Sequence, residues 1–147
     1  MAGFSLDVSA FCEKAKKNPE TVMRQTSLRL FSAIIFETPV AESFGGRLKL
    51  NWQASGTNPA SGILDGLDKT GDATVNKMSD FILKNPYWQD VTLTNNLPYA
   101  EVIEFGGYPG DGPNTIAGYS KQAPAGMVRV NITRFNTLLN EEAAKVK

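Results

Sequence analysis

The chain has 147 residues, a length typical of one domain, and 41% of them are apolar, enough to build a hydrophobic core. Its 15 basic and 15 acidic residues balance, so it lacks the positive excess that drives binding to nucleic acid. It has no histidine and a single cysteine, Cys12, which excludes a histidine general base, an internal disulfide and a cysteine–histidine pair. We therefore expect protein partners, no cofactor and no metal, and we interpret Cys12 as a buried apolar side chain on a helix.

No segment is typical of a signal peptide or of a membrane span. The opening stretch MAGFSLDVSAFCEK carries acidic residues and no long apolar run. The longest clearly apolar run, Ala33 to Phe36, is far shorter than the roughly 20 residues that a membrane helix needs. We expect a soluble cytoplasmic product with no membrane contact.

Two helices are predicted at the start of the chain, either separate or joined as one bent helix. The first covers residues 5–17, with Ser5 or Asp7 as its cap. The second begins at Asn18-Pro19, because asparagine caps helices and proline fits the first helical position. It ends before Pro39, which disfavours helical backbone in the residue preceding it.

The rest of the chain predicts further strands and helices separated by long loops. Strict alternation indicates a strand at 47–54 and a second one at 87–95, and residues 99–105 favour a short helix or turn. A helical period indicates helices at 72–85 and 126–147. Segments rich in glycine, proline and polar residues predict loops at 38–46, 55–71 and 106–124. The predicted class is α+β: one domain over 1–147 with a small antiparallel sheet packed against helices, long loops and a C-terminal helix.

The polar residues offer weak candidates for chemistry. Glu101 and Glu104 lie three apart, but nothing nearby would separate their pKa values for acid–base work. The alternative interpretation is that one faces solvent while the other pairs with an arginine or caps a backbone amide. Ser120-Lys121 lacks the remaining signature of serine–lysine hydrolases. The basic residues before Trp52 could belong to a stacking surface for nucleic acid. Two basic residues on one strand are more typical of an ordinary solvated face.

Two stretches carry a family resemblance: NNLPYAEVIEFGG at 95–107 and YSKQAPAGMVR at 119–129. With this spacing, the preceding strand and the closing helix, the chain resembles the HK97 gp10-like family of tailed-phage proteins, known as tail completion, neck or head–tail joining proteins. The specific residues are Pro98-Tyr99-Ala100, Glu104-Phe105-Gly106 and the run from Gln122 to Met127. Many members end the second motif with Arg-Pro-Phe where this chain has Pro-Ala-Gly-Met, which leaves the ring layer open.

The resemblance implies a structural virion protein without enzymatic activity. Such a protein forms a homo-oligomeric ring, usually a hexamer, at the head-proximal end of the tail. There it contacts the tail terminator and the neck or connector proteins near the portal, and DNA would pass through its lumen. A non-virion assembly chaperone or binding module is the alternative function, and a small carboxylate-dependent hydrolase is a less favoured one.

The predicted interface residues follow from these motifs and loops. We expect Tyr99 and Phe105 to anchor the start of the long loop to the core, and the two glutamates to be surface or interface charges. Glycine would let the chain turn away after Phe105, and the loops would be mobile in the free subunit and ordered on assembly. The full set is Pro98, Tyr99, Glu101, Glu104, Phe105, Gly106, Gly107, Tyr108, Tyr119, Lys121, Gln122, Pro124 and Met127.

Overall fold

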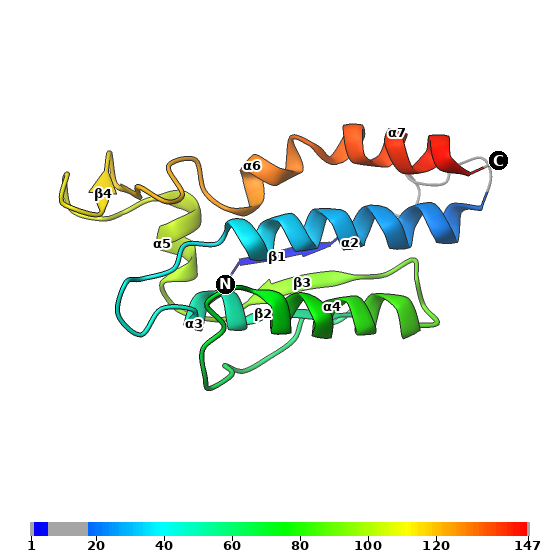
Figure 1. Cartoon of the computed structure of the whole chain (residues 1–147), viewed down its shortest axis with the longest axis horizontal. Coiled ribbons are helices and arrows are strands. Elements are labelled where there is room, and N and C mark those ends of the chain that lie inside the picture. Colours follow the sequence, from blue (N-terminus) through cyan, green and yellow to red (C-terminus); the bar gives the residue numbers. More distant parts are fainter. Residues whose placement is uncertain (1, 6–17, 147) are drawn as a thin grey trace.

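Helices and small antiparallel sheets are combined in one chain (Figure 1), and the predicted α+β class is confirmed. The computed structural model describes residues 2–5 and 18–146. In chain order the elements are β1 (Ala2–Ser5), α2 (Pro19–Glu37), α3 (Arg47–Leu50), β2 (Trp52–Ser55), α4 (Asp72–Lys84), β3 (Thr92–Asn95), α5 (Ala100–Phe105), β4 (Thr115–Ile116), β5 (Tyr119–Ser120), α6 (Val128–Ile132) and α7 (Phe135–Lys145). Within this part of the chain, no helix has the length and apolar character needed to cross a membrane.

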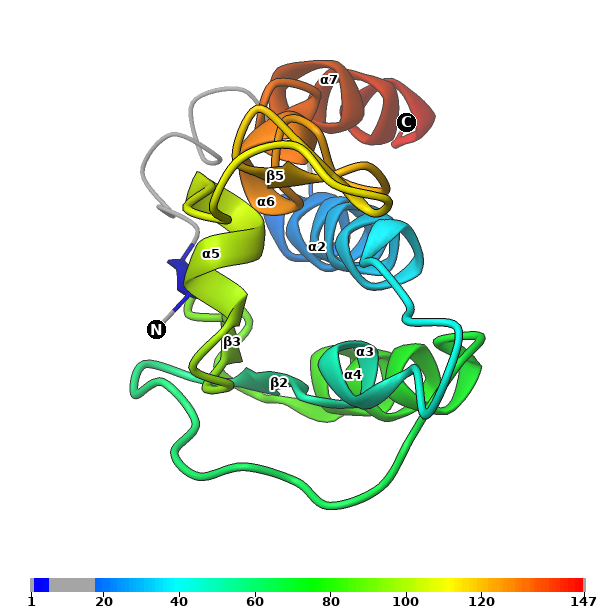
Figure 2. The same ribbon diagram turned by 90° about the vertical axis from the view of Figure 1, so that its left-hand side faces the viewer.

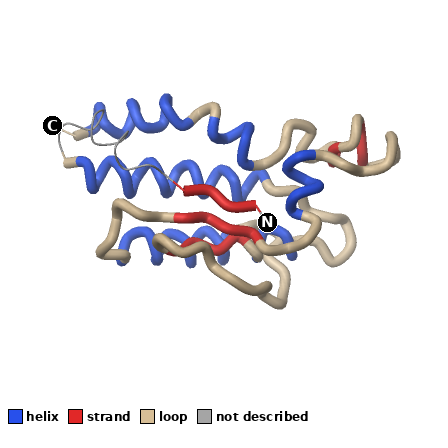
Figure 3. The backbone as a smooth tube through the Cα atoms, turned by 180° about the vertical axis from the view of Figure 1, so that it is seen from behind, coloured by secondary structure: helices blue, strands red, loops and turns tan. Residues whose placement is uncertain are grey.

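The main sheet has the strand order β1–β3–β2, and its pairs are antiparallel (Figure 3). In the middle strand, Asn95 lies opposite Ala2 on one side and Trp52 on the other. A second, two-residue ribbon joins β4 to β5 through Ala117 and Gly118. Both turn residues have positive φ, as a type I′ hairpin turn requires.

α2 is the central element of the fold. It packs against α4 on one side and against α6 and α7 on the other, and α4 also packs on β2 (Figures 1 and 2). It begins as predicted, with the Asn18 side chain accepting a hydrogen bond from the Thr21 amide at 3.3 Å. It ends at Glu37, directly before Thr38-Pro39. Its buried residues are Val22, Met23, Thr26, Ser27, Leu30, Phe31, Ile34 and Ile35.

The predicted strand at 47–54 is wrong in its first half. Residues 47–50 form α3, and the strand begins only at Trp52. The alternating pattern put Lys49 on the solvent face, but Lys49 is buried and its Nζ donates to the Phe36 carbonyl at 2.9 Å. That carbonyl lies in the last turn of α2, where backbone oxygens lack partners inside the helix. Four residues of alternating polarity fit one helical turn as well as a strand. Here the helical turn occurs together with the hydrogen bond from Lys49 to the end of α2.

Other predictions are corrected in extent. The strand predicted at 87–95 is limited to β3, because the Asp90 amide donates to the Tyr87 carbonyl at 3.1 Å and closes a turn. The helix predicted at 126–147 starts at Val128 and is divided between α6 and α7, where the Thr133 hydroxyl donates to the Val130 carbonyl at 2.7 Å.

The structure also differs from the prediction in the first predicted helix and in the last predicted loop. Ser5, predicted as a helix cap, belongs to β1, and residues 6–17 with Cys12 lie outside the described part of the chain. The loop at 106–124 contains β4 and β5, because a positive-φ turn lets even a glycine-rich segment close a short ribbon. The helices predicted at 19–37 and 72–85 and the short helix at 99–105 are confirmed within a residue of their ends.

Asp68 caps the start of α4. Its Oδ1 accepts from the Gly71 amide at 2.9 Å, and its Oδ2 accepts from the Thr74 amide and hydroxyl at 2.8 and 2.7 Å. Since Gly71 holds the capping position without a side chain, Asp68 supplies the missing acceptor. Burial alone would raise the pKa of Asp68, but the hydrogen bonds from Thr74, Gly71 and Thr70 outweigh it, and the pKa lies below its ordinary value.

Acid should therefore weaken this cap. Because its folded-state pKa is lowered, Asp68 contributes fully to the free energy of unfolding above the unfolded-state pKa of about 4, and loses that contribution as the pH falls through the folded-state value. We expect Asp68→Asn to lower the free energy of unfolding at neutral pH by about 1–3 kcal/mol. We also expect the variant to lose less stability than the wild type between neutral pH and about pH 3. Urea unfolding of both chains measures this, and equal acid sensitivity would contradict it.

Candidate functional site

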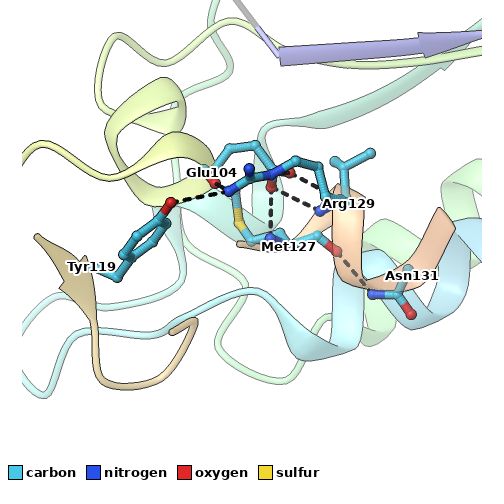
Figure 4. Close-up of polar contacts among 6 residues, drawn as sticks. Glu104, Tyr119, Met127, Arg129 and Asn131 are labelled. Atoms are coloured by element: carbon cyan, nitrogen blue, oxygen red, sulfur yellow. Dashed lines mark hydrogen bonds and ion pairs between the residues drawn. The ribbon is translucent and has the colours of Figure 1, made fainter. Parts of the chain in front are cut away.

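The candidate site is built around Glu104 of α5, which is only 2% exposed. Its Oε2 accepts hydrogen bonds from the amides of Met127 and Val128 at 2.6 and 2.8 Å (Figure 4). Its Oε1 accepts from the Arg129 amide at 2.9 Å. These amides begin α6, and the first N–H groups of a helix have no partner inside it. A buried carboxylate of α5 therefore satisfies the start of α6 and joins the two segments.

The Arg129 side chain covers the same carboxylate. Its Nε lies 3.3 Å from Glu104 Oε1, and its Nη2 donates to the Glu104 carbonyl at 2.6 Å and to the Tyr119 hydroxyl at 3.2 Å (Figure 4). The guanidinium lies over the Phe105 ring, 5.2 Å from its centroid. The hydrogen bond with Tyr119, opposed by desolvation and supported by the charge of Glu104, raises the pKa of Arg129. A charged guanidinium thus balances the buried carboxylate.

Two glycines allow these groups to approach one another. Gly126 has φ +86°, and a Cβ there would lie 2.7 Å from the Glu104 carbonyl oxygen. Gly106 has φ +82°, and a Cβ there would lie 3.1 Å from the Tyr119 ring. Any side chain at either position would meet both steric and backbone strain. We refer to Glu104, Gly126, Met127 and Arg129, with Tyr119, as the Glu104 clamp.

The clamp is tied to the centre of the fold through Asn131. This buried side chain donates to the Met127 carbonyl at 2.9 Å (Figure 4) and to Glu37 Oε2, at the end of α2, at 2.8 Å. Met127 itself is fully buried. The site therefore rests on the core rather than on a loop.

Between the two sides of the clamp runs a segment that we call the strap, residues 107–125. It projects at one end of the molecule and carries β4 and β5 (Figure 1). Its entry is closed by the amides of Gly107 and Tyr108, which both donate to the Gly118 carbonyl at 2.8 and 3.1 Å. The strap is thus a folded hairpin held at its base, not the open loop predicted.

A groove lies between the strap, α5 and the loop at 38–46. Gln122 spans it: the Val40 amide donates to Gln122 Oε1, and Gln122 Nε2 donates to the Val40 carbonyl, both at 2.9 Å. The groove has a volume of about 500 Å³ and combines polar and apolar lining. Its lining residues are Pro39–Leu48, Tyr99, Ile103, Tyr108, Asn114, Thr115, Ser120 and Gln122.

The structure brings part of the predicted interface set together. Glu104, Phe105, Gly106, Tyr119 and Met127 meet at the clamp, while Tyr99, Tyr108 and Gln122 line the groove. The remaining predicted residues, which are exposed and take no part in the clamp, are Pro98, Glu101, Gly107, Lys121 and Pro124.

Two expectations about these residues are wrong. Tyr99 and Phe105 do not anchor the strap to the core, since they are 39% and 59% exposed; Met127 and Ala123 are buried instead. Glu104 is not a surface charge. The alternative interpretation, one glutamate in solvent and the other pairing with an arginine or capping an amide, is confirmed, and Glu104 does both.

The weaker chemical candidates are also placed. The carboxylate of Glu104 is committed to three amides and a guanidinium, whereas Glu101 is exposed on the same helix. Trp52 is buried, with its Nε1 donating to the Thr38 hydroxyl at 2.8 Å, so it provides no stacking surface. Among residues 2–5 and 18–146, no group of three or more potential ligands of the types His, Cys, Asp and Glu is placed to hold a metal ion.

Sequence reasoning missed Arg129 and Val40. Arg129 is the last residue of the second motif, and the expectation that one glutamate pairs with an arginine is the signal that could have pointed to it. Val40 carries none, because it takes part through its backbone. Comparisons with protein-family models, with curated proteins and with solved structures found no match.

The clamp predicts a large cost for Glu104→Gln. The glutamine side chain would direct an N–H donor at the backbone amides and guanidinium that now donate to Glu104. We therefore expect the free energy of unfolding to fall by at least about 1.5–3 kcal/mol. Glu101→Gln, on the exposed face of the same helix, is the matched control and should change it by less than about 1 kcal/mol, since interactions of exposed charges contribute little. Chemical denaturation of both variants measures this. A Glu104→Gln chain as stable as the control would show that the clamp does not hold the fold.

Gly126→Ala separates close approach from backbone strain. Gly62 has the same φ of +86°, but a Cβ there would meet nothing within 4 Å. We expect Gly62→Ala to cost about 1–2 kcal/mol from its left-handed backbone alone. Gly126→Ala should cost about 1–3 kcal/mol more, because its Cβ collides with Glu104. Equal costs in thermal or urea unfolding would contradict the tight packing of the clamp.

Proposed function

We propose that the chain is a structural subunit of a tailed-phage head–tail junction, a tail completion or joining protein that assembles into a ring. The observation that carries the proposal is the Glu104 clamp. The motifs that bear the family resemblance, Glu104-Phe105-Gly106 and Ala125-Gly126-Met127, are distant in sequence and in contact in space. The resemblance therefore coincides with one physical unit, which fixes the base of a projecting strap.

The surface at that end of the molecule supports a role in assembly. The loop at 38–46, α5 and the β4–β5 ribbon lie together there (Figures 1 and 2). They expose a set of large apolar side chains, which we call the end face: Phe44, Tyr99, Phe105 and Ile116. Aromatic groups are enriched at protein interfaces, and apolar groups gathered on a surface are typical of contact sites.

Phe44 is the strongest single argument within the end face. It is 87% exposed and has φ +53°. A bulky side chain is unfavourable in left-handed backbone, and an exposed aromatic ring gains nothing from burial in the free subunit. Backbone strain of this kind clusters at functional positions. Contact with a neighbouring subunit would give both features a purpose.

A ring subunit makes two unlike contacts, so the end face of one copy would meet a different surface of the next. By resemblance, the ring would be hexameric and would sit between the tail terminator and the neck proteins near the portal. A balanced net charge suits protein partners on both sides.

Quantitative mass spectrometry of purified, DNA-filled virions tests the proposal, with the portal protein as internal standard. We expect about one ring's worth of copies, comparable with the portal. Absence from virions would overturn the proposal in favour of an assembly chaperone or binding module. Copies in the hundreds would overturn it in favour of a tail-tube or capsid protein.

Substitution of Phe44 should separate stability from assembly. Asparagine tolerates left-handed backbone, so Phe44→Asn should stabilise the isolated subunit by about 1 kcal/mol while reducing its incorporation into particles. Ala117→Asn, at φ +50°, relieves the same left-handed backbone while removing only a methyl group, and should leave incorporation unchanged. Urea unfolding and complementation measure the two effects. Full incorporation of Phe44→Asn would remove Phe44 from the interface.

A further inference from the structure

In the described part of the chain, two side-chain amides pair with the backbone of a residue distant in sequence, as a neighbouring strand would, and Asn85 makes the same pair locally with Tyr87. Asn51 accepts from the Leu64 amide at 2.7 Å and donates to the Leu64 carbonyl at 3.1 Å. Gln122 accepts from the Val40 amide and donates to the Val40 carbonyl, both at 2.9 Å. A primary amide presents one acceptor beside its donors, so it can satisfy both backbone groups of one residue. Each pair ties a long loop to another part of the fold.

The two pairs differ in their exposure to water. Asn51 is fully buried, and its loss would leave backbone groups without partners away from solvent. Gln122 is exposed, and both of its bonds to Val40 lie at the surface. Water replaces exposed hydrogen bonds at small cost. The same pairing of an amide with backbone is therefore permanent at Asn51 and reversible at Gln122.

The Gln122–Val40 pair is also the connection between the strap and the loop at 38–46. In the part of the chain that the structure describes, no other hydrogen bond joins these two segments. The strap is attached at its base by the Glu104 clamp, and positive-φ glycines flank that attachment at Gly106, Gly107 and Gly126. Because Tyr119 of the clamp lies three residues before Gln122, the strap stays with the clamp, and the loop at 38–46 is the part that can move away when Gln122 releases Val40.

We propose that the Gln122–Val40 pair is a releasable latch, which holds the loop at 38–46 to the strap across the groove and, on release, frees the Val40 backbone and opens the groove. This inference does not depend on the proposed function. It concerns the free subunit and is tested there. Asn51–Leu64 is its permanent counterpart within the same molecule.

Amide hydrogen exchange of the full chain, resolved by NMR, tests the latch. In Gln122→Ala we expect the protection factor of the Val40 amide to fall by about tenfold, equivalent to one hydrogen bond. Protection of the Lys121 amide, which donates to the Asn114 carbonyl, should remain, because this hydrogen bond lies within the strap and does not involve Gln122. The amides of Met127 and Val128, which bind Glu104, should also keep their protection.

Gln122→Glu adds a chemically reversible version of the same test. At neutral pH its carboxylate can accept from the Val40 amide but repels the Val40 carbonyl, so protection should fall. Below about pH 4 the protonated acid regains a donor, and the Val40 protection factor should recover. Asn51→Ala is the buried control and should lower protection throughout the fold.

Two results would overturn the latch. One is an unchanged Val40 protection factor in Gln122→Ala, which would mean that other contacts hold the loop to the strap. The other is an equal loss of protection at Val40, Met127 and Val128, which would make Gln122 a general structural residue. If Gln122→Ala does not fold, the pH response of Gln122→Glu decides, and failure to recover in acid would contradict the proposal.

Discussion

The arrangement of this protein depends on one buried charge, the carboxylate of Glu104. Taking a carboxylate out of water costs on the order of several kcal/mol, and here three backbone amides and the Arg129 guanidinium offset that cost. The same hydrogen bonds satisfy the start of α6, which would otherwise be buried with unpaired donors. Because Glu104 precedes the strap and its partners follow it, this single set of contacts fixes the strap's two ends together. The position of the projecting end of the molecule follows from it.

The rigid and the adaptable parts of the molecule lie at different places along its length. The core-facing side chains of α2 are fully buried, and the helix contacts elements on two sides. At the end face the chain instead keeps Phe44 exposed in left-handed backbone, and holds the strap with an exposed glutamine. These features lower the stability of an isolated subunit and are useful to one that assembles, since a surface held by weak contacts can adjust to a partner. The proposed role in a ring and the inferred latch both rest on this division.

Local signals made the helical part of the fold predictable. Asn18-Pro19 and Thr38-Pro39 mark the limits of α2 in sequence alone, because caps and prolines act on neighbouring residues. Lys49 was placed on the wrong side, because its partner is a backbone carbonyl at the end of another helix. The sequence predicted that one of the two glutamates pairs with an arginine or caps an amide, but neither which glutamate does so nor the amides that it binds, since nothing local relates residue 104 to residues 127–129. Val40 could not be predicted at all, because any residue but proline presents the same backbone.

Under the proposed function, the clamp presents the end face to a neighbouring copy in a head–tail junction. Electron cryomicroscopy of the junction in purified virions tests it most directly. We predict a ring built from this fold, in which Glu104 and Arg129 hold the base of the strap and Phe44 is buried against the adjacent subunit. A junction without this fold, or a ring in which Phe44 remains in solvent, would contradict it.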